Sequence, residues 1–244
     1  MSLGAKIGRR ELWTFALIGL SALGLRFFYL NEISASPLFA VPVVDARTYV
    51  DEARYLSEVS WAGQPKPFWQ PPLYPYLLGL LFAANGENYY LPRLFQALLG
   101  AFVCGLTYLL GLRLFPPAVA IGASLAAVFY GPLIYFGGEL LPTVPALLLN
   151  LLLLLLLFTA PLDQRWPWSI AGFMLGLAAL AVANILLFVP ALLAWLWLTR
   201  VNIVQRGTLF LLGTTLAIAP VTLRNHLVGD DWVLISHNAG INFY

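Results

Sequence analysis

The sequence predicts an all-α, polytopic membrane protein with seven transmembrane helices and juxtamembrane helices in the first extracytoplasmic loop. Three observations support this class. The 244 residues are 61% hydrophobic and only 10% charged, far less charge than a soluble domain carries. Seven apolar segments approach the length of about 20 residues that a helix needs to cross a bilayer. The basic residues gather beside one set of segment ends.

The first predicted span covers about residues 12 to 30 and follows a basic flank with Lys6, Arg9 and Arg10. Its apolar run is longer than the h-region of a signal peptide, so we expect a retained helix. Arg26 lies near the expected outer end of this span, where its side chain is expected to reach toward the headgroups.

The other six predicted spans cover about residues 94 to 112, 117 to 136, 141 to 160, 168 to 183, 185 to 199 and 207 to 223. An eighth apolar run, Leu73 to Ala84, has only about a dozen residues, a length that favours an interfacial or re-entrant segment. When this run does not span, four later arginines share the cytoplasmic side with the N-terminal basic flank, as the positive-inside rule requires. They are Arg113, Arg165, Arg200 and Arg206. The N-terminus is therefore expected in the cytoplasm and the C-terminus outside.

We expect one transmembrane module, 1–244, with a first extracytoplasmic loop at 31–92 and an extracytoplasmic tail at 224–244. The tail is either the end of a minimal module or the start of a C-terminal region of a longer enzyme. Within the loop, Asp45, Tyr49 and Glu52 fall at i, i+4 and i+7, on one face of an amphipathic helix. Because Asp is a favoured N-cap residue, capping is the structural alternative to a chemical role for Asp45.

Several classes of function are excluded by what the sequence lacks. The net charge of +2, without a basic run interleaved with aromatic residues, argues against nucleic acid as a partner. There is no GxGxxG or Walker pattern, so a nucleotide-sugar or ATP site of the usual kinds is not expected. The single cysteine, Cys104, excludes a disulfide framework within the chain. His226 and His237 lack the spacing of a zinc site.

A series of polar positions runs along the chain in a fixed order. Asp45 and Tyr49 come first, then "PPLYPY", then Arg93 and Gln96 in "PRLFQALLG", then "GELLP", and finally "RN" and "NAGINFY". This order resembles the membrane glycosyltransferases of the GT-C fold. Among them it is similar to bacterial relatives of the dolichyl-phosphate-mannose protein mannosyltransferases and the lipid A aminoarabinose transferases. The resemblance covers essentially the whole chain, and it implies juxtamembrane helices and a catalytic aspartate in the first outer loop.

The resemblance implies the inverting transfer of a sugar from a polyprenyl-phosphate donor to a protein, lipid or glycan acceptor. The reaction would take place at the extracytoplasmic face of a membrane, here the bacterial inner (plasma) membrane, among membrane lipids. Asp45 is the expected general base, a role worth about 10² to 10⁴ in rate. Arg93 is expected to bind the departing lipid phosphate, with Lys66 as a second candidate. Interfacial anchoring is the structural alternative for Arg93.

The remaining candidates are assigned to a substrate pocket or to a metal. For Glu139, in "GGELLP", metal binding, acceptor binding and loop capping are all open. The others are Tyr49, Glu52, Gln70, Tyr74 and Asn238. For the tyrosines, anchoring at the membrane interface is the structural alternative. A divalent metal ion is the one cofactor considered, and the sequence does not identify the metal.

The sequence departs from the family pattern at Asp45-Ala46, where many mannosyltransferases have an Asp-Glu pair, so a role for that glutamate is not carried over. Two other classes of function are weighed against the enzyme. A transporter or lipid flippase would predict internal repeats and charges at mid-membrane, whereas the predicted spans hold almost no charge. A non-catalytic membrane scaffold would be favoured if Asp45 proved dispensable.

Overall fold

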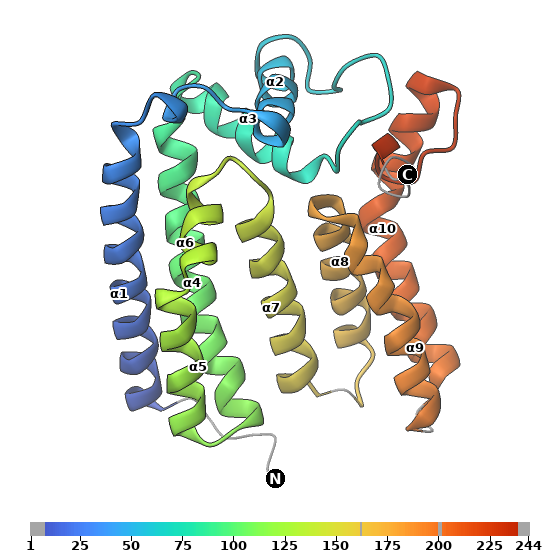
Figure 1. Cartoon of the computed structure of the whole chain (residues 1–244). Helices are drawn as coiled ribbons and strands as arrows, with labels where there is room; N and C mark the ends of the chain where they lie inside the picture. The colour runs from blue at the N-terminus through green and yellow to red at the C-terminus, as the bar shows by residue number, and fades with distance from the viewer. Residues whose placement is uncertain (1–7, 162, 200–201, 239–244) are drawn as a thin grey trace. The chain divides into compact units, whose positions relative to one another are not determined.

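The structure is a computed structural model that describes residues 8–161, 163–199 and 202–238. These residues form helices, joined by turns and loops, without a β-strand (Figure 1). The helices are α1 (Arg9–Ser34), η1 (Pro37–Phe39), α2 (Val44–Glu58), α3 (Leu73–Asn85), α4 (Tyr90–Leu114), α5 (Pro117–Phe129), α6 (Gly131–Gly138), α7 (Thr143–Thr159), α8 (Trp166–Ala181), η2 (Ala183–Leu187), α9 (Phe188–Leu198) and α10 (Ile203–Gly229). The predicted all-helical class is confirmed.

The chain divides into two compact units, each made of two stretches of sequence. Unit 1 consists of Met1–Asp51 and Leu81–Thr159, and unit 2 consists of Glu52–Leu80 and Ala160–Tyr244. The boundaries fall inside α2 and α3, so both of these helices contribute residues to both units. The single transmembrane module expected from the sequence stays a prediction.

In unit 1, α4 is the central helix and packs against α1, α5 and α7. Small residues bring these helices close together. A Cβ added at Gly105 of α4 would lie 2.5 Å from the Phe15 ring of α1, and one at Gly111 would lie 2.9 Å from Ala120 of α5. Lipid tails are as apolar as leucine, so association of membrane helices depends on such close packing rather than on water exclusion.

In unit 2, α8 and α10 form the main helix pair. Their backbones meet at two glycines. A Cβ at Gly172 of α8 would lie 1.9 Å from the carbonyl oxygen of Phe210, and one at Gly213 of α10 would lie 2.2 Å from that of Ser169. Gly176 follows Gly172 after one helical turn and faces Ala217, which completes a pattern of small residues spaced by four.

Within the part of the chain that the structure describes, three helices, α1, α4 and α10, are long and apolar enough to cross a membrane. The predicted span at 117–136 is instead two helices, α5 and α6, which meet at an angle of 48°. Pro132 explains the break, because it has no N–H to donate to the carbonyl four residues earlier. Counting this pair as one gives up to four candidate spans.

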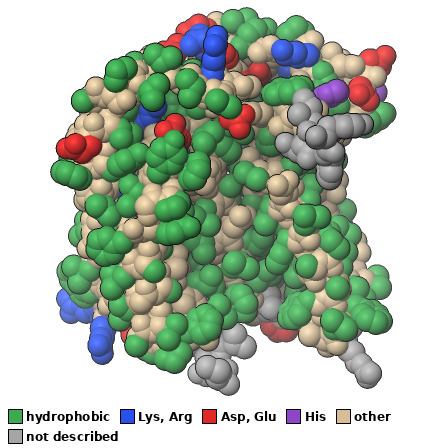
Figure 2. Space-filling model, in the orientation of Figure 1, with side chains coloured by type: hydrophobic (Ala, Val, Ile, Leu, Met, Phe, Trp, Pro, Cys, Tyr) green, Lys and Arg blue, Asp and Glu red, His purple; other side chains and the backbone are tan. Residues whose placement is uncertain are grey.

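The other predicted spans coincide with shorter apolar helices, α7, α8 and the segment Ala183–Leu198. The count of seven therefore stays a prediction. α3, with 13 residues, is shorter than a spanning helix, as expected for the run that begins at Leu73. Hydrophobic side chains, green in Figure 2, cover much of the visible surface of the helices. Large exposed ones occur in both units, including Leu17 and Leu20 of α1 and Leu212 and Leu216 of α10. Such surfaces indicate contact with a bilayer.

The prediction that Arg26 reaches toward the headgroups is wrong. Its side chain is only 4% exposed and packs inside unit 1, where Nη1 donates to the carbonyl of Ala22 at 3.2 Å. Gly100 of α4 makes the room, since a Cβ there would lie 2.7 Å from Arg26 Nε. The facing glycine, which the pattern of α1 alone does not reveal, decides the direction of this side chain.

Candidate functional site

Asp45 and Tyr49 lie one helical turn apart near the start of α2, in unit 1. The helix begins at Val44, which has a φ of 51°, so Asp45 lies in the first turn and not before it. This position does not support the N-cap alternative. A carboxylate in the first turn still interacts favourably with the helix dipole. Asp45 is exposed, whereas Tyr49 is buried. Burial, and then the charge of Asp45, raise the pKa of Tyr49, so the phenol beside the carboxylate is neutral at physiological pH.

Arg93 of α4 is buried and bonded to backbone carbonyls. Its Nε donates to Gly138 at 2.7 Å, and its Nη1 donates to Phe39 at 3.1 Å and to Tyr89 at 3.2 Å. The guanidinium carbon also lies 4.0 Å from the centroid of the Phe39 ring. With 4% of its surface exposed, Arg93 joins η1, the start of α4 and the end of α6 inside unit 1. The anchoring alternative, which needs an exposed side chain, is wrong.

Gln96, one turn along α4, holds the segment that carries Glu139. Its buried Nε2 donates to the carbonyls of Gly137 at 2.9 Å and Glu139 at 2.6 Å. Glu139 is the C-cap of α6 and has an extended backbone. The structure thus brings the predicted residues Arg93 and Glu139 together through adjacent carbonyls at the end of α6. The role of Gln96 was not predicted, although its spacing of three from Arg93 is compatible with a shared helix face.

Arg224, near the end of α10 in unit 2, has the same type of bonding. Its Nε donates to the carbonyl of Ala62 at 2.8 Å, its Nη1 to that of Lys66 at 2.7 Å, and its Nη2 to that of Gln64. The guanidinium carbon lies 4.0 Å from the centroid of the Phe68 ring. Residues Ala62 to Phe68, the loop that we call the Lys66 loop, are therefore wrapped around this one side chain.

Asn225, the next residue, connects the Lys66 loop to the tail after α10. It is fully buried, and its Oδ1 accepts from the backbone N–H of Phe68 at 3.2 Å. Its Nδ2 donates to the carbonyls of Val233 at 3.2 Å and Ile235 at 3.0 Å. In the sequence, the pair "RN" contributes only to the family resemblance. Two adjacent polar residues at the end of an apolar helix are the feature of the sequence that could have indicated this structural role.

Glu52 and Lys66 differ in their surroundings. Glu52 Oε2 accepts from Gln64 Nε2 at 2.8 Å, but its Oε1 is buried and has no hydrogen-bond partner among the described residues. Burial raises the pKa of Glu52, opposed most strongly by the charge of Arg224. Lys66 is exposed, and its ammonium has no hydrogen bond or ion pair with any residue that the structure describes. Glu52 is thus a half-buried carboxylate with a raised pKa, and Lys66 is an accessible cation.

Gln70 and Tyr74, the candidates beside the proline pair, are buried in unit 2. Gln70 is 9% exposed and Tyr74 is completely buried. Tyr74 therefore does not fit the alternative of an interfacial anchor, which needs its hydroxyl at the bilayer surface. The neighbouring Tyr76 donates its hydroxyl to the carbonyl of Trp61 at 2.9 Å, which attaches α3 to the segment before the Lys66 loop.

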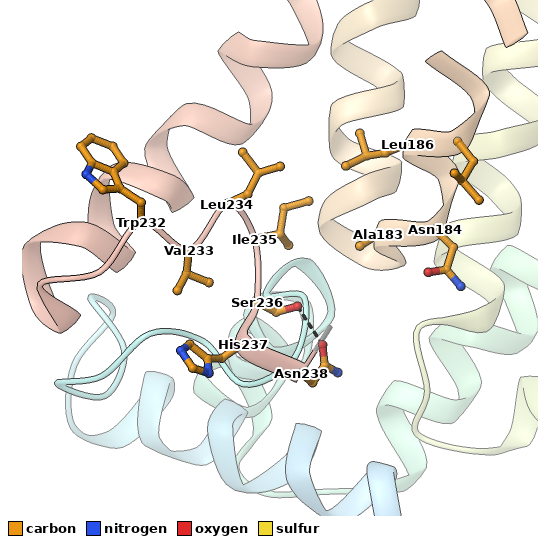
Figure 3. Close-up of a pocket in the computed structure, with 11 residues that line it drawn as sticks. Ala183, Asn184, Leu186, Trp232, Val233, Leu234, Ile235, Ser236, His237 and Asn238 are labelled. Atoms are coloured by element: carbon orange, nitrogen blue, oxygen red, sulfur yellow. Dashed lines mark hydrogen bonds between the residues drawn. The ribbon is translucent and has the colours of Figure 1, made fainter. Parts of the chain in front are cut away.

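Asn238 lies in a cavity of about 910 Å³ between η2 and the tail, drawn in Figure 3. The polar side chains that line it are Asn184, Ser236, His237 and Asn238, and Ser236 Oγ donates to Asn238 Oδ1 at 3.0 Å. The volume is in the range of small-molecule sites. A neighbouring, more apolar cavity of about 840 Å³ runs along α10 and shares Leu186, Trp232 and Leu234 with the first.

No group of three or more His, Cys, Asp or Glu side chains that would hold a metal ion occurs in the described part of the chain. In the tail, two side chains of these types lie close together: His237 Nε2 and Asp231 Oδ2 are 3.7 Å apart. The proposed roles of Glu139, Glu52 and Asn238 toward a metal stay predictions.

The fold and the site together define the class of protein. Apolar helices of spanning length are those of an integral membrane protein. A family model described as dolichyl-phosphate-mannose-protein mannosyltransferase matches residues 69–223, more than half of the chain, and the chain belongs to this family. Membership indicates an activity of the GT-C glycosyltransferase type.

The matched region contains four of the predicted site residues, Gln70, Tyr74, Arg93 and Glu139. It begins after Asp45 and Lys66, so the family match does not test their roles. No match was found among curated proteins or among solved structures.

Proposed function

We propose that this protein transfers a sugar from a polyprenyl-phosphate donor to a protein, lipid or glycan acceptor, with inversion at the anomeric carbon. The observation that carries the proposal is the family match over residues 69–223. A lipid-linked donor is consistent with a chain that has membrane-spanning helices and none of the usual nucleotide-binding motifs. In the proposal the reaction takes place on the extracytoplasmic face of a bacterial inner membrane, with the N-terminus in the cytoplasm and the C-terminus outside.

Asp45 is the proposed general base. Its exposed carboxylate lies beside the buried, neutral phenol of Tyr49, a group that carries no competing charge. As the acceptor oxygen or nitrogen bonds to the anomeric carbon, its proton passes to the carboxylate. The bond from that carbon to the phosphate oxygen breaks, and its electron pair leaves with the lipid phosphate. Attack opposite the leaving group inverts the configuration.

Lys66 is the proposed contact for the departing phosphate. A leaving lipid phosphate needs no general acid, but a cation beside it stabilises the developing charge. The Lys66 ammonium is accessible, whereas the Arg93 guanidinium already donates to three carbonyls. Arg93 stays a candidate, and a role in donor binding requires it to exchange some of those carbonyls for phosphate oxygens. The cavity that contains Asn238 is the proposed pocket for a sugar or acceptor group.

The base is tested by Asp45→Asn, which keeps the size of the side chain and removes its ability to accept a proton. The readout is release of polyprenyl phosphate from polyprenyl-phosphate mannose in membranes that contain the overexpressed protein and the host's own acceptors. Turnover should fall by about 10² or more, while expression and donor binding stay near wild type. The matched control is Asp51→Asn, an exposed carboxylate on the same helix that pairs with Arg47 at 3.7 Å.

Turnover of Asp45→Asn near the wild-type rate would refute Asp45 as the base and direct the search to Glu52 and Glu139. Absence of polyprenyl phosphate release by the wild-type protein, with movement of the intact donor across the bilayer, would instead favour the flippase class.

A further inference from the structure

Every nitrogen of the Arg224 guanidinium donates to the Lys66 loop. The three acceptors are the carbonyls of Ala62, Gln64 and Lys66, and the Phe68 ring covers one face of the group. Nη1 also donates to the Asn225 side chain at 3.2 Å. A guanidinium presents five N–H donors in a rigid plane, and here that plane is directed at backbone oxygens. Arg224 is therefore poorly available for a bidentate contact with a phosphate.

The loop has the backbone that this contact requires. Gly63 has a φ of 80°, in the region that favours glycine, and a Cβ there would lie 2.8 Å from Arg224 Nη2. Pro65 and Pro67 flank Lys66 and restrict the chain on both sides of it. Gly229, at the end of α10, packs so closely on Pro67 that a Cβ would lie 2.4 Å from Pro67 Cγ. The backbone around Lys66 is therefore restrained by contacts with α10 and by its own prolines.

The backbone and the side chain of Lys66 have different surroundings. Its carbonyl accepts from Arg224 Nη1 at 2.7 Å, whereas its side chain is exposed and its ammonium lacks a hydrogen bond or ion pair among the described residues. We infer that Arg224 is a positioning residue for the lipid-phosphate donor, which fixes the Lys66 loop so that the Lys66 ammonium is presented to the phosphate. This inference rests on the proposed role of Lys66 in the glycosyltransferase reaction.

The expected consequence is a change in donor binding rather than in the chemical step. A loop that is already ordered loses little conformational entropy when the phosphate binds, so preorganisation appears as affinity. Loss of the Arg224 contacts should raise the donor KM. It should leave kcat nearly unchanged, because the bound complex contains the same reacting groups. Arg224 acts through Lys66 and does not itself contact the reacting atoms.

The test uses Arg224→Lys in the full-length protein, because an ammonium keeps the charge but cannot span three carbonyls. The donor KM, measured with polyprenyl-phosphate mannose, should rise by about tenfold while kcat changes by less than about twofold. Arg206→Lys is the matched control on the same helix, where the guanidinium carbon lies 5.5 Å from the Trp168 ring centroid, and it should leave KM unchanged. Gly63→Ala, which strains the loop without altering any charge, should raise KM in the same way.

The coupling between the two residues is the decisive measurement. If Arg224 acts through Lys66, the double variant Arg224→Lys, Lys66→Ala should have the same donor KM as Lys66→Ala alone. Hydrogen exchange without donor should also speed up at the amides of residues 62–68 in Arg224→Lys. Additive effects on KM, or unchanged exchange in the loop, would overturn the inference.

A donor KM that is unaffected by Lys66→Ala would also overturn it, while the function proposed for Asp45 would stand on its own assay. Loss of that function would be recognised separately, by a wild-type protein that releases no polyprenyl phosphate.

Discussion

Arg93 in unit 1 and Arg224 in unit 2 form the same kind of cluster with different consequences. Each guanidinium carbon lies 4.0 Å from a Phe ring centroid, and each group donates to three backbone carbonyls. The carbonyls around Arg93 come from three different segments, and its side chain is only 4% exposed. Those around Arg224 come from one loop, and its side chain is half-buried. Arg93 joins helices, whereas Arg224 shapes a loop.

The comparison shows why arginine occurs at such places in an apolar chain. Carbonyls at helix ends and in loops lack partners in their own segment, and a buried carbonyl without a partner is costly. One guanidinium satisfies several of them at once because its donors diverge in a plane. The two arginines differ in the number of chain segments whose carbonyls they bind. Removal of an arginine that binds several segments should affect the stability of the unit, whereas removal of one that binds a single loop should affect the order of that loop.

The units also differ in how their helices approach, and the largest expected effect comes from this difference. Gly172→Leu should destabilise unit 2 by about 3 kcal/mol or more, because even the first side-chain carbon would collide with the backbone of Phe210. Thermal unfolding in detergent, followed by size-exclusion chromatography, measures the loss. Gly24→Leu in α1, where nothing lies within 4 Å of an added Cβ, is the control. Equal melting temperatures for the two variants would contradict the close packing of α8 and α10.

A smaller effect is expected at Arg93 and sharpens the comparison with Arg224. Arg93→Ala leaves the buried carbonyl of Gly138 without its donor, at a cost of about 1 to 3 kcal/mol. Arg93→Lys should recover only part of this stability, since one ammonium lacks the planar fork. The measurement pairs the melting temperature with donor KM. A wild-type melting temperature together with a raised donor KM in Arg93→Ala would instead support the direct phosphate contact expected from the sequence.

The smallest expected effect concerns Glu52. Because burial raises its pKa above the ordinary value, the folded state binds the proton more tightly than the unfolded chain does. Wild-type stability should therefore fall as pH rises from the ordinary carboxyl pKa toward the raised one, and Glu52→Gln should remove this loss. The melting temperatures of the two proteins are compared across that window, with Glu58→Gln, an exposed site on the same helix, as control. A variant no more stable than wild type above the window would show that Glu52 ionises without penalty.

Local pattern was sufficient for the class of the protein and for most helices. The low charge content and the apolar runs predicted a helical membrane protein, and α1, α4 and α10 lie where spans were expected. The helical spacing of Asp45, Tyr49 and Glu52 predicted a helix that the structure contains as α2. These predictions hold because helix formation and membrane insertion depend on residues within about 20 positions of one another.

Contacts between distant segments decided the rest. The outward direction expected for Arg26 was wrong because Gly100, on another helix, provides the space that its side chain fills. The clusters around Arg93 and Arg224 join residues that lie up to 54 and 162 positions apart in the chain. No periodicity records which carbonyl a guanidinium meets at that separation. An arginine in an apolar stretch of sequence therefore indicates that a polar partner is needed. Tertiary packing determines that this partner is a set of backbone carbonyls.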